Sequence, residues 1–298
     1  MQTSSGISPS KVFLPQQEQR FALLLNFLIH QFPAIPEKEW LSRFEDGLIS
    51  NVDGVPLDAS VGYEGGTVIY YFKRVVSEEL IPFQEKILYE DAHLLIADKP
   101  HFLPVTPGGH YLEQTLLVRL KKATGLESLS PIHRIDRETA GLVAFSKRSE
   151  DRNAYQSLFR DKAVTKVYEA IAVYRGDLRQ QFPIHHRSRI KESDAFMQMH
   201  EVVGEPNSDS LVELLAVKGE WARYRLQLGT GKKHQLRVHM SALGLPIKND
   251  QIYPVLKPHV VINKDFTHPL QLLAKELSFT DPITQKKHHF FSQQALHL

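Results

Sequence analysis

The chain has 298 residues, a length typical of two domains or of one large domain with an appendage. Hydrophobic residues make up 42% and charged residues 23%, which excludes disorder and collagen-like repeats. Because cysteine is absent, disulfides, thiolate metal sites and a cysteine nucleophile are excluded. The sequence shows neither an apolar run of membrane-helix length nor a secretory signal, so we expect a cytoplasmic protein without membrane contact.

The charge is unevenly distributed along the chain. Residues 1–80 contain 6 Lys+Arg and 10 Asp+Glu, whereas residues 81–298 contain 30 and 24. A basic larger part suits a polyanionic partner, because cationic grooves concentrate phosphates. The same excess is compatible with ordinary surface charge. Charge alone therefore leaves nucleic-acid binding open.

The N-terminal part reads as a small domain over residues 1–80. The first dozen residues are rich in Ser and Thr and look like a frayed terminus. Apolar periodicity, with Pro and Gly as terminators, then predicts two short helices and two strands, at residues 21–32, 37–46, 48–52 and 67–72.

The pattern changes in the larger part, which we expect to be one domain over residues 81–298. Apolar runs and alternation predict strands at residues 88–97, 142–145, 167–174 and 222–228. Helical spacing predicts helices at residues 112–124, 149–159 and 233–243. Strands interspersed with helices, without strict alternation, predict an α+β fold with a mixed, largely antiparallel sheet.

The densest polar cluster is a loop at residues 131–141, directly before an expected strand. It contains several side chains suited to a functional site, namely His133, Arg134, Asp136 and Thr139. The apolar residues Ile132 and Ile135 predict that the loop packs against the domain and holds Asp136 in a defined position. A solvated charged loop is the alternative.

The second cluster lies at residues 229–240. It is not a P-loop, because the required glycine and hydroxyl residue are missing, and not a dinucleotide fingerprint, because His234 replaces the third glycine. What remains is a turn leading into a helix on which His234, Arg237 and Ser241 share one face. An arginine in such a place pairs with a carboxylate or a phosphate; the alternative is a surface salt bridge worth about 0 to 1 kcal/mol.

The sequence of the first cluster resembles a known catalytic motif. Residues 133–147 read HRIDRETAGLVAFSK and closely resemble H-R-L-D-x-x-T-S-G-L-L-L-x-x-K, the catalytic motif of the RluA-type family of RNA pseudouridine synthases. Ala140 stands where the family usually has Ser. Three further segments match family motifs in the family's order. Residues 99–107 are similar to K-P-x-G-x-x-V-x-P, and residues 166–170 are similar to K-x-Y-x-A. Residues 230–253 are similar to T-G-R-x-H-Q-I-R-V-H followed by G-x-P-I-x-x-D-x-x-Y.

The resemblance implies isomerisation of uridine in RNA to pseudouridine, without metal or other cofactor. Asp136 would be the catalytic carboxylate, which either attacks the sugar or the base or removes a sugar proton. Arg237 would be its salt-bridge partner and would favour its ionised form. Tyr168 would lie against the uracil ring.

The resemblance also implies contacts with a structured RNA, ribosomal or transfer, bound by a monomer. Arg134 would enter the RNA helix and occupy the space that the flipped nucleotide leaves. Further substrate contacts would come from His133, Thr139, Lys232, His234 and Gln235. Lys232 replaces the usual Arg, so bidentate phosphate geometry is lost there.

The N-terminal unit resembles an S-four-like RNA-binding module in its two helices and β meander, although its net negative charge is unfavourable for phosphate binding. Among rivals, a glycoside hydrolase would need a second carboxylate, and the sequence offers Glu138 without a visible partner. A metal site is not predicted, because His234 and His239 are five residues apart. A non-catalytic RNA-binding protein with the synthase fold remains the alternative from another class.

Overall fold

The computed structural model describes residues 7, 9–16, 21–73, 78–193, 198–257 and 265–298. The chain forms two units, Met1–Leu80 with Pro107–Gly125, and Ile81–Thr106 with Leu126–Leu298. The sequence placed residues 107–125 in the larger domain, but their contacts assign them to the first unit. The Glu78 carboxylate is one reason, because it accepts backbone N–H bonds from Leu112, Glu113 and Gln114 at 2.6–2.9 Å.

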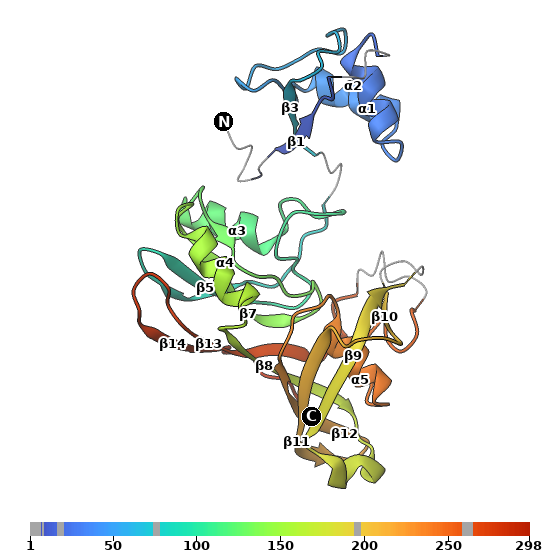
Figure 1. The fold of residues 1–298 in the computed structure, drawn as a ribbon, viewed down its shortest axis with the longest axis vertical. Coiled ribbons are helices and arrows are strands. Elements are labelled where there is room, and N and C mark those ends of the chain that lie inside the picture. Colours follow the sequence, from blue (N-terminus) through green and yellow to red (C-terminus); the bar gives the residue numbers. More distant parts are fainter. Residues whose placement is uncertain (1–6, 8, 17–20, 74–77, 194–197, 258–264) are drawn as a thin grey trace. The chain divides into compact units, whose positions relative to one another are not determined.

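The first unit has a three-stranded antiparallel sheet in the order β1-β3-β2. Its strands and helices are β1 (Ser10–Phe13), α1 (Leu24–Gln31), α2 (Glu37–Glu45), β2 (Ile49–Ser50), β3 (Val68–Tyr71) and α3 (Leu116–Thr124) (Figure 1). The expectation of a frayed N-terminus is wrong for β1, whose backbone pairs with β3 and whose Val12 is buried. Fully buried Trp40 and Leu28 form the centre of the core.

The second unit contains most of the strands. Its elements are β4 (Lys86–Glu90), β5 (Leu94–Lys99), β6 (Ser130–Pro131), β7 (Ala140–Ser146), α4 (Arg152–Arg160), β8 (Thr165–Val173), η1 (Gly176–Gln181), β9 (Ile184–Glu192), β10 (Met199–Val202), β11 (Ser208–Lys218), β12 (Trp221–Leu228), α5 (Gln235–Ala242), β13 (Leu272–Thr280) and β14 (Lys287–Phe291). Among the helices of the described residues, none is both long and apolar enough to cross a bilayer.

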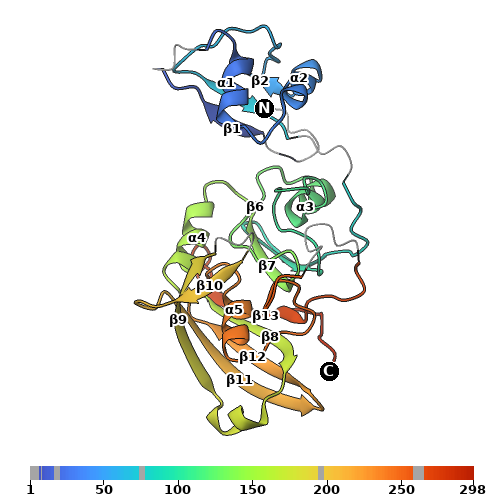
Figure 2. The same cartoon turned by 90° about the vertical axis from the view of Figure 1, so that its right-hand side faces the viewer.

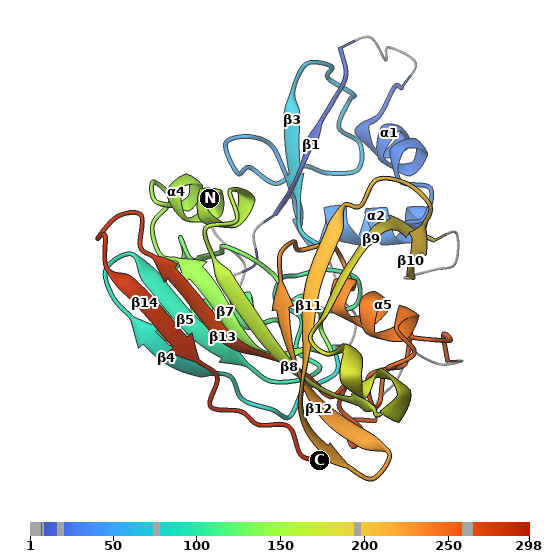
Figure 3. The same cartoon turned by 60° about the horizontal axis from the view of Figure 1, so that its bottom comes forward.

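The second unit is built on an 11-stranded sheet. Its main path runs β10-β9-β11-β12-β8-β13-β7-β5-β4, with β14 paired to β13 and β6 to β7. Figure 3 shows β7 and β13 on one side of β8, and β11 and β12 on the other. The β7–β13 pair is parallel and the other strand pairs of the described residues are antiparallel. The predicted α+β class with a mixed, largely antiparallel sheet is confirmed.

The approach of β7 to β13 requires a glycine. Gly141 has a φ of +110°, and a Cβ atom there would lie 2.2 Å from the carbonyl oxygen of Ala274. A side chain at this position would clash with backbone, which has little room to move. Because Gly141 follows the Asp136 loop, this contact fixes where the loop ends.

Helix α5 lies over a buried apolar layer. Alternate residues of β12, including Tyr224 and Leu226, point into this core and pack with Leu236 and Met240 of the helix. The helix begins at Gln235, two residues later than predicted, because His234 takes a left-handed backbone conformation with a φ of +55°. All residues from Gln235 to Met240 are buried, so α5 has polar side chains inside the protein as well as apolar ones.

Candidate active site

A cleft of about 1180 Å3 lies within the second unit. Its walls come from the loop before β7, the α4–β8 connection and the turn between β12 and α5. All nine residues that the sequence selected line this cleft: His133, Arg134, Asp136, Thr139, Tyr168, Lys232, His234, Gln235 and Arg237. Segments more than a hundred residues apart in sequence therefore meet at one concave surface.

The Asp136 loop is joined to β7 at its start and closed by a turn within the loop at its end. Ile132 is buried and donates its backbone N–H to the Ala144 carbonyl at 2.9 Å. At the other end, buried Thr139 donates its backbone N–H to the Asp136 carbonyl at 3.2 Å. The Asp136 side chain is 26% exposed, so the carboxylate is held on the wall of the cleft and remains accessible.

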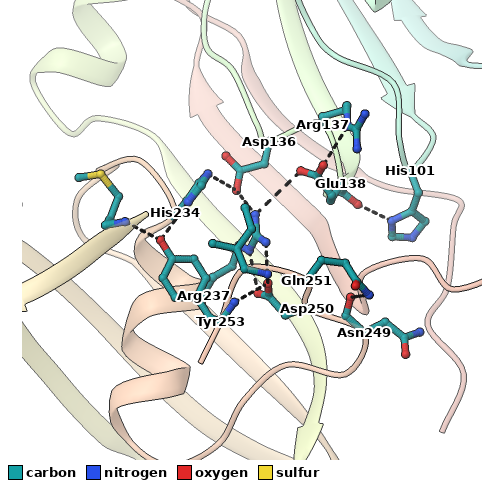
Figure 4. A network of polar contacts seen from close by, with 12 residues as sticks. His101, Asp136, Arg137, Glu138, His234, Arg237, Asn249, Asp250, Gln251 and Tyr253 are labelled. Atoms are coloured by element: carbon teal, nitrogen blue, oxygen red, sulfur yellow. Dashed lines mark hydrogen bonds and ion pairs between the residues drawn. The ribbon is translucent and has the colours of Figure 1, made fainter. Parts of the chain in front are cut away.

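Arg237 connects Asp136 to a second, buried carboxylate (Figure 4). Its Nη1 lies 3.3 Å from Asp136 Oδ2, while its Nε and Nη2 donate to the two oxygens of Asp250 at 2.8 and 2.6 Å. The sequence assigned Arg237 to Asp136 alone. The correction is that Asp250 is the main partner, because it takes the bidentate pair and leaves one nitrogen for Asp136.

The charge of Arg237 is strongly favoured. Burial opposes the charge, but the hydrogen bonds and negative charge of Asp250, and then the charges of Asp136 and Glu138, more than offset it, so the pKa of Arg237 is raised. Glu138 does have partners, contrary to expectation. Its carboxylate accepts from Arg137 Nε at 2.8 Å and lies 3.9 Å from Arg237 Nη1. Burial would raise the pKa of Glu138, but Arg137 and Arg237 lower it overall.

His234 is in contact with Asp136 from the other side. Its Nδ1 lies 3.0 Å from the Tyr253 hydroxyl and its Nε2 lies 3.9 Å from Asp136 Oδ2. The Tyr253 hydroxyl accepts the Met199 backbone N–H, so its own proton is free to go to Nδ1. Burial is the main reason that the pKa of His234 is lowered, which favours the neutral ring with its proton on Nε2, directed at Asp136.

Tyr168 belongs to β8, lines the cleft and is 8% exposed as a whole residue. Burial, followed by the negative charge of Asp136, raises the pKa of Tyr168, so its hydroxyl stays protonated at neutral pH. The ring can therefore offer a flat apolar face together with a hydrogen-bond donor.

The loop that carries Asp136 is also held from β5. Buried Lys99 donates its Nζ to the carbonyl of Arg137 at 3.1 Å. His101 Nδ1 lies 2.7 Å from the carbonyl of Glu138. Burial lowers the pKa of Lys99 to about 7, and nearby Glu138 and Asp136 oppose this shift. These contacts fix the backbone at residues 137 and 138.

Gln235 differs from the other predicted substrate contacts. Its Oε1 accepts from Thr230 Oγ1 at 2.7 Å and from the Lys232 backbone N–H at 3.1 Å. Its Nε2 donates to the Asp209 carbonyl at 2.8 Å and to Ser210 Oγ at 3.0 Å. The amide thus closes the turn before α5, which is a positioning role. Arg134 and Lys232, by contrast, are exposed at the cleft.

Comparisons with known proteins agree with this site. The family model described as RNA pseudouridylate synthase matches residues 93–242. The chain is 29% identical to an uncharacterised RNA pseudouridine synthase of Synechocystis sp., covering 77% of this chain and 79% of that one. It is 32% identical to the dual-specificity RNA pseudouridine synthase RluA of Vibrio cholerae, covering 66% and 77%.

The chain belongs to the RNA pseudouridylate synthase family. The RluA-type membership expected from the motifs is confirmed, and the protein is an isomerase that converts uridine in RNA to pseudouridine. Among solved structures, human RNA pseudouridylate synthase domain containing 1 has the same fold, with a TM-score of 0.56 and 19% identity over 73% of this chain and 86% of that one.

Three side chains at the site of the synthase were not predicted from the sequence. Asp250 and Tyr253 stand in the matched G-x-P-I-x-x-D-x-x-Y segment, and Lys99 stands in the matched K-P segment, but none was given a role. The motif spacing was the available signal. It could not indicate that Asp250 pairs with Arg237, since that depends on how the segment after α5 turns back.

His133 lines the cleft but is held by the fold. Its ring stacks on Phe159 at a centroid distance of 4.6 Å, and its Nε2 accepts the Ala144 backbone N–H at 3.1 Å. Burial, with a smaller effect from Lys166, lowers the pKa of His133 to about 3. Protonation would also break the bond from Ala144, so the folded synthase keeps this ring neutral.

This histidine predicts a pH dependence of stability. In the unfolded chain its pKa is about 6.5, so the unfolded state binds more protons between about pH 6.5 and 3, and stability falls as the pH falls through this range. We expect His133→Phe, which can keep the stack on Phe159, to flatten the decrease in the free energy of unfolding between pH 7 and 5 by up to about 1.4 kcal/mol per pH unit. Denaturant unfolding at each pH measures the free energy of unfolding, and its slope against pH is compared between the variant and the unsubstituted chain. His268→Phe, at a side chain 68% exposed, is the control, and an unchanged slope in His133→Phe would contradict the prediction.

Proposed function

We propose that Asp136 is the catalytic carboxylate of the synthase and that Arg237 holds it in place. The observation that carries the proposal is the bridge that Arg237 makes between Asp136, at the cleft, and Asp250, which is 1% exposed. A buried bidentate pair with Asp250 gives the guanidinium one orientation, so its third nitrogen, Nη1, has a fixed position beside Asp136. Asp136 is thereby held with one oxygen toward Arg237 and the rest of the carboxylate toward the cleft.

The reaction breaks the bond between ribose C1′ and uracil N1 and forms a bond from C1′ to uracil C5. The C5 proton is released and N1 gains a proton, so the atoms balance. Asp136 either forms a covalent intermediate with the sugar or the base, or removes a sugar proton. Tyr168 packs against the uracil ring, and its protonated hydroxyl is suited to donate to the base.

The substrate in this proposal is structured RNA, ribosomal or transfer. Cationic side chains on the walls of the cleft support it, since they would contact phosphates: Arg134, Arg160, Lys162, Lys166, Lys232 and Lys233. The Vibrio cholerae relative is named for dual specificity, which fits either RNA class. The base would reach Asp136 only after leaving its stack, because the carboxylate lies on the wall of a concave site.

The experiment is tritium release from RNA that carries tritium at uracil C5. The full chain is incubated separately with labelled ribosomal and transfer RNA, and released tritium is counted against time. Multiple turnovers on at least one of the two RNAs are expected. RNA binding without release would instead favour a non-catalytic RNA-binding protein with this fold.

Arg134 provides a test of how the RNA is held. Its side chain is exposed at the cleft two residues before Asp136, where it would fill the space of the flipped nucleotide. We expect Arg134→Ala to reduce kcat/KM about tenfold or more on a uridine within a duplex, and less on an unpaired uridine, because unstacking costs a few kcal/mol only in the duplex. Equal losses of kcat/KM on the two RNAs would show that Arg134 does not fill the space left by the flipped nucleotide. Arg175→Ala, at an exposed arginine outside the cleft lining, is the matched control.

The monomeric state, the cytoplasmic location and the S-four-like character of the N-terminal unit stay predictions from the sequence. Among the described residues, those that line the cleft all belong to the second unit, which is compatible with catalysis by a single chain.

A further inference from the structure

Three potential metal ligands converge outside the cleft. They are His186 from β9, Glu201 from β10 and His239 from α5, elements that lie close together in the fold (Figure 2). His186 Nε2 lies 2.8 Å from Glu201 Oε1, and His239 Nε2 lies 4.0 Å from the same oxygen. The cluster belongs to neither the Asp136 site nor the set of residues that line the cleft.

The spacing of these atoms fits a small divalent ion. Ligands at about 2.0 to 2.2 Å from a tetrahedral zinc ion lie about 3.3 Å from one another. The two measured separations, 2.8 and 4.0 Å, are on either side of this value, and all three ligand atoms lie within 4.8 Å of one another. Side-chain movements of less than about 1 Å would therefore bring them to coordination distance.

The surroundings of His239 resemble an outer shell that orients a ligand. Its ring is 0% exposed, and its Nδ1 lies 2.9 Å from Ser210 Oγ. Its Nε2 lies 2.9 Å from Ser208 Oγ and 3.1 Å from Ser188 Oγ. Because a serine hydroxyl can donate or accept, Ser210 can take the Nδ1 proton and leave Nε2 for a metal ion.

The site also has access to solvent. The side chains of His186 and Glu201 are 21% and 27% exposed, whereas that of His239 is fully buried. An ion could enter from the side of β9 and β10 and keep a water molecule or a serine hydroxyl as its fourth ligand. Two imidazoles and one carboxylate are a ligand set that suits Zn2+.

We propose that His186, Glu201 and His239 form a binding site for one divalent transition-metal ion, best matched by Zn2+. The ion would join β9 and β10 to α5, the helix that carries Arg237 two residues before His239. Its role would be structural, since the cluster does not line the cleft. The proposal is independent of the catalytic roles proposed above.

The test uses the full chain after removal of metals with a chelator. Titration calorimetry with Zn2+ alone should give one site per chain, and Co2+ alone should give the visible absorption of a tetrahedral complex. His186→Ala and Glu201→Gln should each weaken Zn2+ binding by about 100-fold or more, since even the loss of an outer-shell partner costs 10- to 100-fold. Zn2+ should also raise the thermal unfolding midpoint of the unsubstituted chain, because it binds only the folded state.

His185→Ala is the matched control. His185 is the neighbouring histidine on β9, but it faces Asp209, with Nε2 3.0 Å from both carboxylate oxygens. This variant should bind Zn2+ as tightly as the unsubstituted chain and show the same rise in midpoint. The proposal fails if the unsubstituted chain shows no saturable binding, or if His185→Ala loses affinity as much as His186→Ala and Glu201→Gln do. It also fails if both cluster variants keep the affinity. Tritium release from the metal-free chain is measured separately. The metal-binding result and the catalytic result therefore test the two proposals independently.

Discussion

Asp136→Asn is expected to reduce tritium release from C5-labelled RNA by about 10^3-fold or more, since loss of a residue that reacts covalently typically removes most of an enzyme's rate enhancement. Asparagine has the same shape as aspartate and can still accept a hydrogen bond from Arg237 Nη1, which is now 3.3 Å from Oδ2. It cannot act as a nucleophile or as a base at neutral pH. The loss should therefore appear in kcat, while the dissociation constant for unlabelled RNA changes little.

The control for this variant is Asp177→Asn, at an exposed aspartate that pairs with Arg175 away from the cleft lining. It should keep full activity. If Asp136→Asn released tritium at the same rate as Asp177→Asn, Asp136 would not be the catalytic carboxylate. A loss of RNA binding equal to the loss of rate would assign it to substrate binding.

Among the variants proposed here, Arg237→Met should lower the free energy of unfolding the most. Removing the guanidinium leaves Asp250, 1% exposed, as an unpaired buried charge, which costs about 3 to 5 kcal/mol in the free energy of unfolding. It also removes the contact to Asp136, so tritium release should fall by about 100-fold or more, as expected when a reacting group is misplaced. Denaturant unfolding and the release assay measure the two effects.

A double variant separates these effects. Arg237→Met with Asp250→Asn removes both charges of the buried pair, so residue 250 no longer carries an unpaired charge. The asparagine oxygen can still accept the backbone N–H groups of Ile252 and Tyr253, which Asp250 Oδ1 accepts in the unsubstituted chain. We expect the double variant to recover most of the unfolding free energy without recovering activity. Recovery of activity along with stability would show that Arg237 acts only through the fold. Arg175→Met, at an exposed ion pair, should change stability by less than about 1 kcal/mol.

Arg237→Lys adds a test of geometry. Lysine keeps the positive charge but cannot form a bidentate pair with Asp250 while it contacts Asp136. An activity between those of the methionine variant and the unsubstituted chain is expected. Activity equal to that of the unsubstituted chain would show that charge alone is sufficient.

Much of the second unit could be predicted from local patterns. The strand at residues 222–228 could be predicted because its side chains alternate between an apolar and a polar face. In the structure this strand is β12, which spans Trp221–Leu228. Strands β9, β10 and β11 were not predicted. Strand β9 carries His, Arg and Lys at positions that are partly exposed, so it lacks an apolar signal and is fixed by pairing with β10 and β11.

The sequence by itself determined the α+β class, the family and the loop that presents Asp136, because motifs and periodicity are written in neighbouring residues. Tertiary structure alone decided which charges meet. Arg237 has Asp250 as its main partner, Glu138 is paired, and His186 lies beside His239 although 52 intervening residues separate them. Such pairs depend on sheet order and on where each chain segment turns back, and the energy of an ion pair depends on distance and burial, which spacing along a chain does not specify.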